Sequence, residues 1–183
     1  MSSVSLVIPA FNEARYLEKT LKQAQRLPYD LEIIVINDGS TDETADIAAR
    51  YADHVINFSE NRGKGKALQA GWRLAKGHYL VCLDADLGET VTEAELLIAP
   101  VMEKKADIAV SQLKAGKKSG FGLIKRRART IVYQQTGVWL HSPLSGQRAF
   151  ERKWLPVLLS CPYKGFGVET QMNIALLKLV LNF

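Results

Sequence analysis

Short runs of apolar, often β-branched residues alternate with amphipathic stretches along the first 112 residues. Such runs are typical of buried strands in a parallel sheet, and apolar side chains at helical spacing indicate helices. The expected strands are residues 4–9, 31–37, 54–58, 78–84 and 107–112, and the expected helices are 13–26, 41–51, 65–75 and 92–104. Ser40 or Thr41 is expected to cap the second helix. The alternation predicts an α/β domain with a mostly parallel central sheet and helices on both faces.

The pattern changes after residue 113. Residues 114–122 form a Gly- and Lys-rich stretch typical of a loop, and a basic helix over 123–136, a strand over 145–150 and an amphipathic helix over 168–181 are expected after it. No internal repeat or low-complexity linker separates the two parts. We therefore expect a single domain over 1–183, with a first half of residues 1–113 and a second half of residues 114–183.

Composition excludes several classes of protein. The 183 residues are 47% hydrophobic and 23% charged, which argues against wholesale disorder. Cys82 and Cys161 form no CxxC pair, which excludes a disulfide scaffold or a zinc ribbon and favours a reducing compartment. The sequence shows neither a signal peptide nor an apolar run long enough to span a bilayer. We expect a cytoplasmic protein, with peripheral contact at the inner face of the membrane as an option.

The net charge of +5 hides an asymmetry between the two halves. Residues 1–113 carry 12 Lys and Arg against 17 Asp and Glu, whereas residues 114–183 carry 12 against 2. This basic half indicates an anionic partner, such as phosphate, nucleic acid or a membrane surface, unless it is only a solvated basic helix. Few aromatic residues interleave with the bases, which disfavours nucleic acid. Residues 114–129, which hold seven of the bases, are expected to meet phosphate headgroups or a phosphorylated acceptor.

Polar, acid-bearing segments follow three of the expected strands: PAFNE at 9–13, NDGSTD at 37–42 and DAD at 84–86. Ligands of parallel α/β sheets bind beyond the carboxyl ends of the strands, so these segments should meet at one edge. Asp84 and Asp86 are two residues apart and point the same way in an extended chain, where their charges repel unless a cation lies between them. The pair predicts a Mg²⁺ or Mn²⁺ site, with a simple turn as the alternative.

Two further segments can hold a nucleotide. Asp38 precedes Gly39 and Ser40, so it either forms an Asx-turn or accepts hydrogen bonds from a ribose or base. The segment NRGKGK at 61–66 opens a helix, where glycines, bases and the helix N-terminus favour an anion over a solvated turn. No GxGxxG follows the first strand and no GxxxxGK[ST] occurs, which disfavours a dinucleotide fold and excludes a P-loop.

The chain resembles the family-two glycosyltransferases of the GT-A fold in four ordered motifs: PAFNE (9–13), NDGSTD (37–42), NRGKGKA (61–67) and DADL (84–87). It is most similar to the dolichyl-phosphate mannosyltransferase-like branch, whose later motifs resemble SGQRAF (145–150) and GFGVE (165–169). The resemblance covers nearly the whole chain. It implies a GT-A fold in which residues 1–113 bind a nucleotide sugar and residues 114–183 form an acceptor half.

The resemblance also implies the roles of individual residues. The donor, a UDP- or GDP-sugar, would be held by residues of all four motifs: Pro9, Ala10, Phe11, Glu13, Asp38, Gly63, Lys66, Asp84 and Ala85. Asp84 and Asp86 would bind the Mn²⁺ or Mg²⁺ ion that bridges the diphosphate. The catalytic residues would be Asp86, Arg148 near the transferred sugar or acceptor phosphate, and Glu169 near the acceptor.

The implied reaction is divalent-metal-dependent transfer of a sugar to a lipid phosphate, a saccharide or a small phosphorylated molecule, with inversion at the anomeric carbon. A hydroxyl acceptor needs a general base, for which Glu169 is the candidate. Related retaining transferases that glycosylate phosphoglycerate share much of the nucleotide half, so retention stays open as the alternative to inversion.

The chain departs from its branch in LGET after Asp86, and it ends before the further strand and basic motif of that branch, so a short acceptor half is expected.

Two other classes of protein stay open. A sugar-phosphate nucleotidyltransferase also uses an α/β sheet and a metal, but it usually has a Gly-rich, Arg-containing loop where this chain has PAFN at 9–12. A non-catalytic or truncated nucleotide-binding protein would keep the donor motifs and lack transfer. The sequence leaves homo-oligomerisation open.

Overall fold

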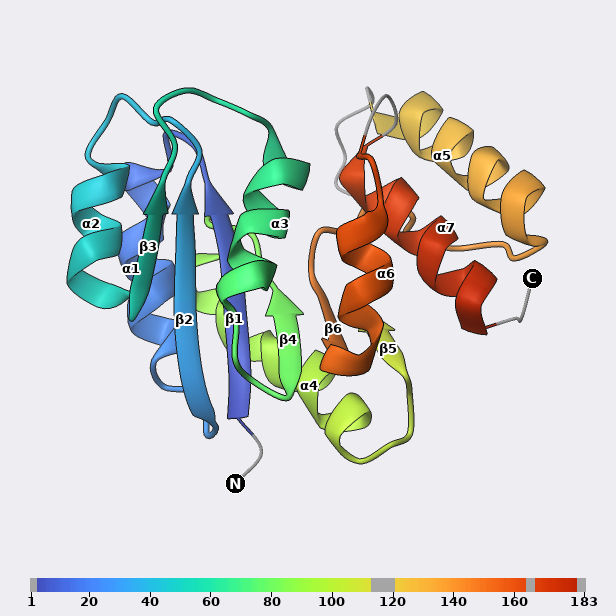
Figure 1. The fold of residues 1–183 in the computed structure, drawn as a ribbon, viewed down its shortest axis with the longest axis horizontal. Helices are drawn as coiled ribbons and strands as arrows, with labels where there is room; N and C mark the ends of the chain where they lie inside the picture. The colour runs from blue at the N-terminus through green and yellow to red at the C-terminus, as the bar shows by residue number, and fades with distance from the viewer. Residues whose placement is uncertain (1–2, 113–120, 164–166, 181–183) are drawn as a thin grey trace.

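The computed structural model describes residues 3–112, 121–163 and 167–180, and these form one six-stranded sheet (Figure 1). The strands are β1 (Ser3–Ala10), β2 (Asp30–Asn37), β3 (His54–Asn57), β4 (Tyr79–Cys82), β5 (Ile108–Val110) and β6 (Arg148–Glu151). Their order across the sheet is β3-β2-β1-β4-β6-β5. Only β6 runs against its neighbours β4 and β5, and the other described pairs are parallel. The predicted mostly parallel sheet is confirmed.

Helices cover both faces of the sheet, as the sequence predicts. They are α1 (Ala14–Ala24), α2 (Thr44–Tyr51), α3 (Lys64–Leu74), α4 (Glu95–Met102), α5 (Phe121–Thr136), α6 (Leu155–Ser160) and α7 (Val168–Val180), with 3₁₀ turns η1 (Gly88–Ala94) and η2 (Arg152–Trp154). The first core packs α1, α2, η1 and α4 on one face, and the second packs α3, α6 and α7 on the other. Helix α5 packs on α7 rather than on the sheet (Figure 1).

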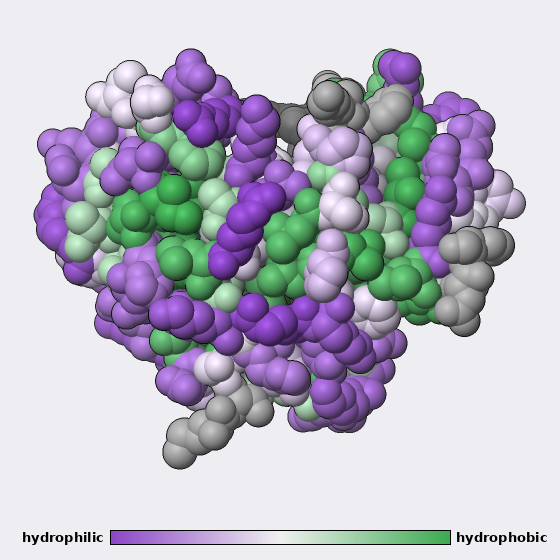
Figure 2. Space-filling model, in the orientation of Figure 1, coloured by the Kyte–Doolittle hydropathy of each residue, from purple (hydrophilic) through white to green (hydrophobic). Residues whose placement is uncertain are grey.

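The central strand β1 is buried on both faces, which explains its nearly continuous apolar sequence. Leu6 and Ile8 point into the first core and Val7 into the second, as the alternation of side chains along a strand requires. The second core centres on Trp72, whose ring meets Phe150 edge to face. In the space-filling view, hydrophobic side chains show between hydrophilic ones over this face (Figure 2).

Several predicted element boundaries are wrong. Helix α2 begins at Thr44 rather than near residue 41, because Ser40 and Thr41 bond to another loop instead of capping it. The expected helix over 92–104 is a 3₁₀ turn followed by the shorter α4. Helix α6 was not predicted, since six residues are too few to show a helical period.

The basic second half is described only in part. Lys114, Lys117 and Lys118 of the expected acceptor loop lie outside the described residues, as do residues 165 and 166 of the late motif. Within the described ranges, no helix combines the length and apolar character needed to cross a membrane.

Candidate active site

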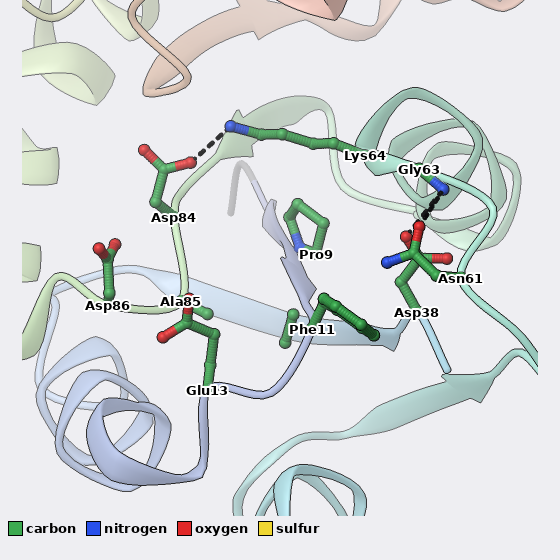
Figure 3. Close-up of a pocket in the computed structure, with 11 residues that line it drawn as sticks. Pro9, Phe11, Glu13, Asp38, Asn61, Gly63, Lys64, Asp84, Ala85 and Asp86 are labelled. Atoms are coloured by element: carbon green, nitrogen blue, oxygen red, sulfur yellow. Dashed lines mark hydrogen bonds and ion pairs between the residues drawn. The ribbon is translucent and has the colours of Figure 1, made fainter. Parts of the chain in front are cut away.

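A pocket of about 420 Å³ opens beyond the carboxyl ends of β1, β2 and β4 (Figure 3). Its walls come from all four motifs: Pro9, Ala10, Phe11, Glu13, Asp38, Asn61, Gly63, Lys64, Asp84, Ala85 and Asp86. The volume falls within the range of about 300–1,000 Å³ that is usual for small-molecule sites. The convergence follows from the parallel strands, whose carboxyl ends share one edge of the sheet.

The loops after β1 and β2 are joined by reciprocal hydrogen bonds. The Asn12 amide donates to Ser40 Oγ over 2.9 Å, and the Thr41 amide donates to Asn12 Oδ1 over 2.9 Å. Asn12 adopts a φ of 55°, a left-handed conformation that asparagine tolerates better than most residues. These bonds hold the 9–13 wall of the pocket in place.

Asp42 and Thr44 cap two helices at once. The Ala14 amide at the start of α1 donates to Asp42 Oδ2 over 3.1 Å, and the Thr44 amide at the start of α2 donates to Asp42 Oδ1 over 3.0 Å. The Glu13 amide donates to Thr44 Oγ1 over 2.9 Å. Side-chain oxygens thus satisfy amides that have no partner inside either helix, and they fix Glu13 at the pocket.

Asp38 is buried at the pocket wall and binds the loop that follows β3. The Arg62 amide donates to Asp38 Oδ1 over 2.7 Å, and the Gly63 amide donates to Asp38 Oδ2 over 2.9 Å. An Asx-turn, one of the two alternatives for Asp38, would have been local, whereas these bonds join Asp38 to the loop after β3. Gly63 adopts a φ of 88°, which glycine accommodates without strain. Each carboxylate oxygen keeps further capacity to accept a ligand hydrogen.

Lys64, rather than the predicted Lys66, is the lysine of the glycine-rich segment that lines the pocket. Lys66 is exposed on α3 and is not among the lining residues. Gly65 lets the chain near Tyr163 pack closely, because a Cβ there would lie 2.9 Å from Tyr163 Cβ. The segment contains two lysines two residues apart, which point in different directions on a helix. The start of α3 at Lys64 therefore determines which of the two side chains faces the pocket.

Lys64 joins two carboxylates from distant parts of the chain. Its Nζ lies 2.7 Å from Asp84 Oδ1 and 2.9 Å from Glu169 Oε1. Burial opposes the ammonium charge, but the two carboxylates outweigh it and raise the pKa of Lys64. A Cβ on Gly146 would lie 2.5 Å from Nζ and 2.6 Å from Asp84 Oδ1, so a larger residue there would require the ends of both side chains to shift. The structure therefore brings Glu169 of the second half to Lys64 at the edge of the pocket.

The carboxylates of Glu13, Asp84 and Asp86 lie near one another in the pocket wall. Burial, followed by the charge of Asp86 and of two further aspartates, raises the pKa of Glu13. The described residues contain no group of three or more His, Cys, Asp or Glu side chains placed to hold a metal. Asp84 and Asp86 alone still suit Mg²⁺ or Mn²⁺, which take oxygen ligands and draw the rest from water and substrate phosphates. The residues present fit such an ion.

Arg148 does not line the pocket, and its side chain is fully buried. It donates from Nη2 to the Ser145 carbonyl over 2.6 Å and from Nη1 to Asn173 Oδ1 over 3.2 Å. Burial lowers the pKa of Arg148. These contacts join the turn that contains Gly146 to α7. Arg148 therefore fixes the position of this turn without reaching the pocket itself.

Comparison with known proteins identifies the family. The family described as Glycosyl transferase family 2 matches residues 5–168. The chain belongs to this family. The predicted family is therefore confirmed, and membership favours glycosyl transfer over nucleotidyl transfer. The dolichyl-phosphate mannosyltransferase-like branch stays a prediction.

Relatives of this family-2 chain include longer proteins. It is 31% identical to an uncharacterized protein of Methanocaldococcus jannaschii, over 80% of this chain and 64% of that protein. It is 30% identical to undecaprenyl-phosphate 4-deoxy-4-formamido-L-arabinose transferase of Proteus mirabilis, over 88% of this chain and 52% of that protein. The chain thus spans less than two thirds of each relative.

Solved structures share the fold. Glucosyl-3-phosphoglycerate synthase from Mycobacterium tuberculosis, in complex with Mn²⁺, UDP and glucosyl-3-phosphoglycerate, superposes with a TM-score of 0.75 at 22% identity. The match covers 98% of this chain and 66% of the synthase. It confirms the predicted GT-A fold of this family-2 chain.

Proposed function

We propose that the chain transfers a sugar from a nucleoside diphosphate to an acceptor, in the manner of the dolichyl-phosphate mannosyltransferase-like branch. The observation that carries this proposal is the pocket, in which Asp84, Asp86 and Lys64 converge beside Asp38. Two carboxylates that suit a hard cation and one ammonium are the groups that a bound diphosphate needs. Residues 1–113 would bind the donor and residues 114–183 would serve the acceptor.

The donor would lie along the pocket from its nucleoside end to its carboxylate end. Asp38 and Asn61 lie at one side and Asp84 and Asp86 at the other, with Phe11 nearer the first (Figure 3). We assign the base and ribose of a UDP- or GDP-sugar to Asp38 and the exposed Phe11 ring. The diphosphate then lies beside Lys64 and the two aspartates.

Asp84 and Asp86 would hold Mn²⁺ or Mg²⁺, and that ion supplies Lewis-acid neutralisation of the diphosphate leaving group. The synthase from M. tuberculosis is crystallised with UDP and Mn²⁺ or Mg²⁺, which supports this assignment. Lys64 adds a second positive charge where negative charge develops as the bond from the anomeric carbon to the diphosphate breaks.

Glu169 would act on the acceptor. In the proposed inverting displacement, an acceptor oxygen bonds to the anomeric carbon on the face opposite the departing diphosphate. A hydroxyl acceptor passes its proton to Glu169, which lies 2.9 Å from Lys64 and so adjoins the donor site. A phosphate acceptor is already an anion and needs no base. Arg148, fully buried, would keep the surrounding turn in place rather than touch the sugar.

The acceptor class that we favour is a lipid phosphate at an anionic membrane surface. In the first turns of α5, Leu123 is 78% exposed and Ile124 is 57% exposed, next to Lys125 and the exposed Arg126. Apolar side chains beside bases suit the headgroup region of such a membrane. The relative from P. mirabilis is named undecaprenyl-phosphate 4-deoxy-4-formamido-L-arabinose transferase, and the lipid phosphate in that name supports the same class.

The test measures nucleotide binding by calorimetry with UDP and GDP, with and without Mn²⁺. Asp86→Ala is expected to abolish the Mn²⁺-dependent part of binding while the melting temperature is kept. Glu89→Ala, which changes an exposed acid outside the pocket, is the control. Metal-independent binding of equal strength in wild type and Asp86→Ala would overturn the proposal. Binding without turnover of any nucleotide sugar would instead favour the non-catalytic alternative.

A further inference from the structure

The buried hydroxyl group of Thr20 is hydrogen-bonded to the backbone of residues 84–88, the segment that carries both pocket aspartates. Thr20 lies on α1 with no exposed surface. Its Oγ1 donates to the Ala85 carbonyl over 2.8 Å and accepts the Gly88 amide over 2.8 Å. Its own helix offers the Tyr16 carbonyl only at 3.2 Å. The hydroxyl therefore spans the chain from Ala85 to Gly88, and Asp86 lies between these two anchors.

The two hydrogen bonds of the Thr20 hydroxyl fix the backbone conformation between Ala85 and Gly88. The strand ladder of β4 ends at Cys82, and η1 begins at Gly88, so the intervening residues have no regular structure to direct them. Gly88 adopts a φ of 56°, which sharpens the turn at the end of the segment. Both backbone groups bonded by Thr20 are buried, and without the hydroxyl neither would have this partner.

The neighbouring contact between the same two elements cannot replace the hydroxyl. Lys19 on α1 pairs with Glu89 on η1 over 2.9 Å, but the two side chains are 58% and 74% exposed. An exposed ion pair is screened by water and holds geometry weakly. A buried pair of hydrogen bonds to the backbone orients the segment more strictly.

We propose that Thr20 is a positioning residue for Asp86 and through it for the metal and diphosphate. The inference rests on the proposed donor site. Without the hydroxyl, the Ala85 carbonyl and the Gly88 amide must find other hydrogen-bond partners. The backbone between them then shifts, and the Asp86 carboxylate leaves the position in which it meets the cation. Groups that orient metal ligands in this way typically change metal affinity by about ten- to a hundredfold.

The experiment compares Thr20→Val, which keeps the shape and removes the hydroxyl, with Thr20→Ser, which keeps the hydroxyl. The matched control is Thr136→Val, because Thr136 Oγ1 also donates to a helix carbonyl and accepts a backbone amide, but on α5 outside the pocket lining. The readouts are Mn²⁺ affinity by electron paramagnetic resonance, Mn²⁺-dependent UDP or GDP affinity by calorimetry, and melting temperature.

We expect Thr20→Val to weaken Mn²⁺-dependent nucleotide binding by about ten- to a hundredfold. Thr20→Ser and Thr136→Val should stay close to wild type in binding. Wild-type affinity in Thr20→Val overturns the inference, and so does an equal loss in Thr20→Ser. Asp86→Ala is the reference: if it binds as wild type does, the proposed function fails, whereas a loss there with none in Thr20→Val defeats the role of Thr20 alone.

A measurement on the wild-type protein keeps the inference testable if Thr20→Val does not fold. Hydrogen exchange followed by NMR should show a slowly exchanging Gly88 amide, since its hydrogen is bonded to a buried hydroxyl. Rapid exchange of the Gly88 amide while the amides of α1 stay protected would overturn the inference.

Discussion

Replacing Lys64 by methionine should change metal binding and nucleotide binding in opposite directions. The ammonium of Lys64 lies 2.7 Å from Asp84 Oδ1, at a carboxylate that we assign to the metal. Methionine keeps most of the apolar stem and removes the charge. The free protein would then offer Asp84 to Mn²⁺ without competition, while the diphosphate would lose a cationic partner.

The size of the effect follows from the distance. Two unit charges 2.7 Å apart attract by roughly 1.5 kcal/mol in bulk water and roughly 6 kcal/mol at an effective dielectric constant of about 20. The Lys64 side chain is 36% exposed, so the value lies nearer the lower limit, and we take about 2 kcal/mol. At about 1.4 kcal/mol per factor of ten, this corresponds to a change of roughly thirtyfold.

We therefore expect Lys64→Met to bind Mn²⁺ roughly thirtyfold more tightly in the absence of nucleotide, and UDP or GDP more weakly in its presence. Electron paramagnetic resonance measures the first affinity and calorimetry the second. Lys66→Met is the matched control, since Lys66 is exposed outside the pocket lining. Unchanged or weaker Mn²⁺ binding in Lys64→Met would refute the competition, and a larger effect at Lys66 would refute the choice of lysine.

Three further predictions concern other parts of the structure. Gly146→Ala should weaken Mn²⁺-dependent nucleotide binding by calorimetry, because its Cβ would lie 2.5 Å from Lys64 Nζ; unaltered binding would contradict this packing. Burial and nearby carboxylates raise the pKa of Glu13, so its contribution to stability is lost as pH rises through that pKa; Glu13→Gln should melt higher than wild type at pH 7, with the gap closing below the ordinary value of 4.5. Arg126→Glu should reduce co-sedimentation with anionic vesicles but not with neutral ones, by about 1 kcal/mol for the base lost; equal binding to both vesicle types would count against the membrane surface.

Several motif residues make hydrogen bonds that join loops, and the sequence did not predict these structural roles. Asp42 of the motif NDGSTD accepts the first amide of α2, and it also caps α1, 28 residues earlier in the chain. Asp38 was predicted either to form a local turn or to bind a ligand. In the structure it lines the pocket and also accepts hydrogen bonds from amides 24 and 25 residues away. Each bond joins two loops, and loop conformation leaves no periodic signal in a sequence.

The sequence by itself determined the sheet and the edge at which the site lies. A buried strand requires an apolar run and a helix requires an apolar stripe, so local periodicity reports both. Once the sheet is parallel, the strands must present Asp38, Asp84 and their neighbours at one common edge.

Only the tertiary structure decided which side chains meet within that edge. It selected Lys64 over Lys66 through the phase of α3, buried Arg148 behind the pocket, and brought Glu169 to Lys64 from the other half of the chain. It also placed the Thr20 hydroxyl on an amide 68 residues away. The physical reason is that side-chain contacts depend on how elements pack across long stretches of chain, whereas the periodicity that forms each element is set by its nearest neighbours in sequence.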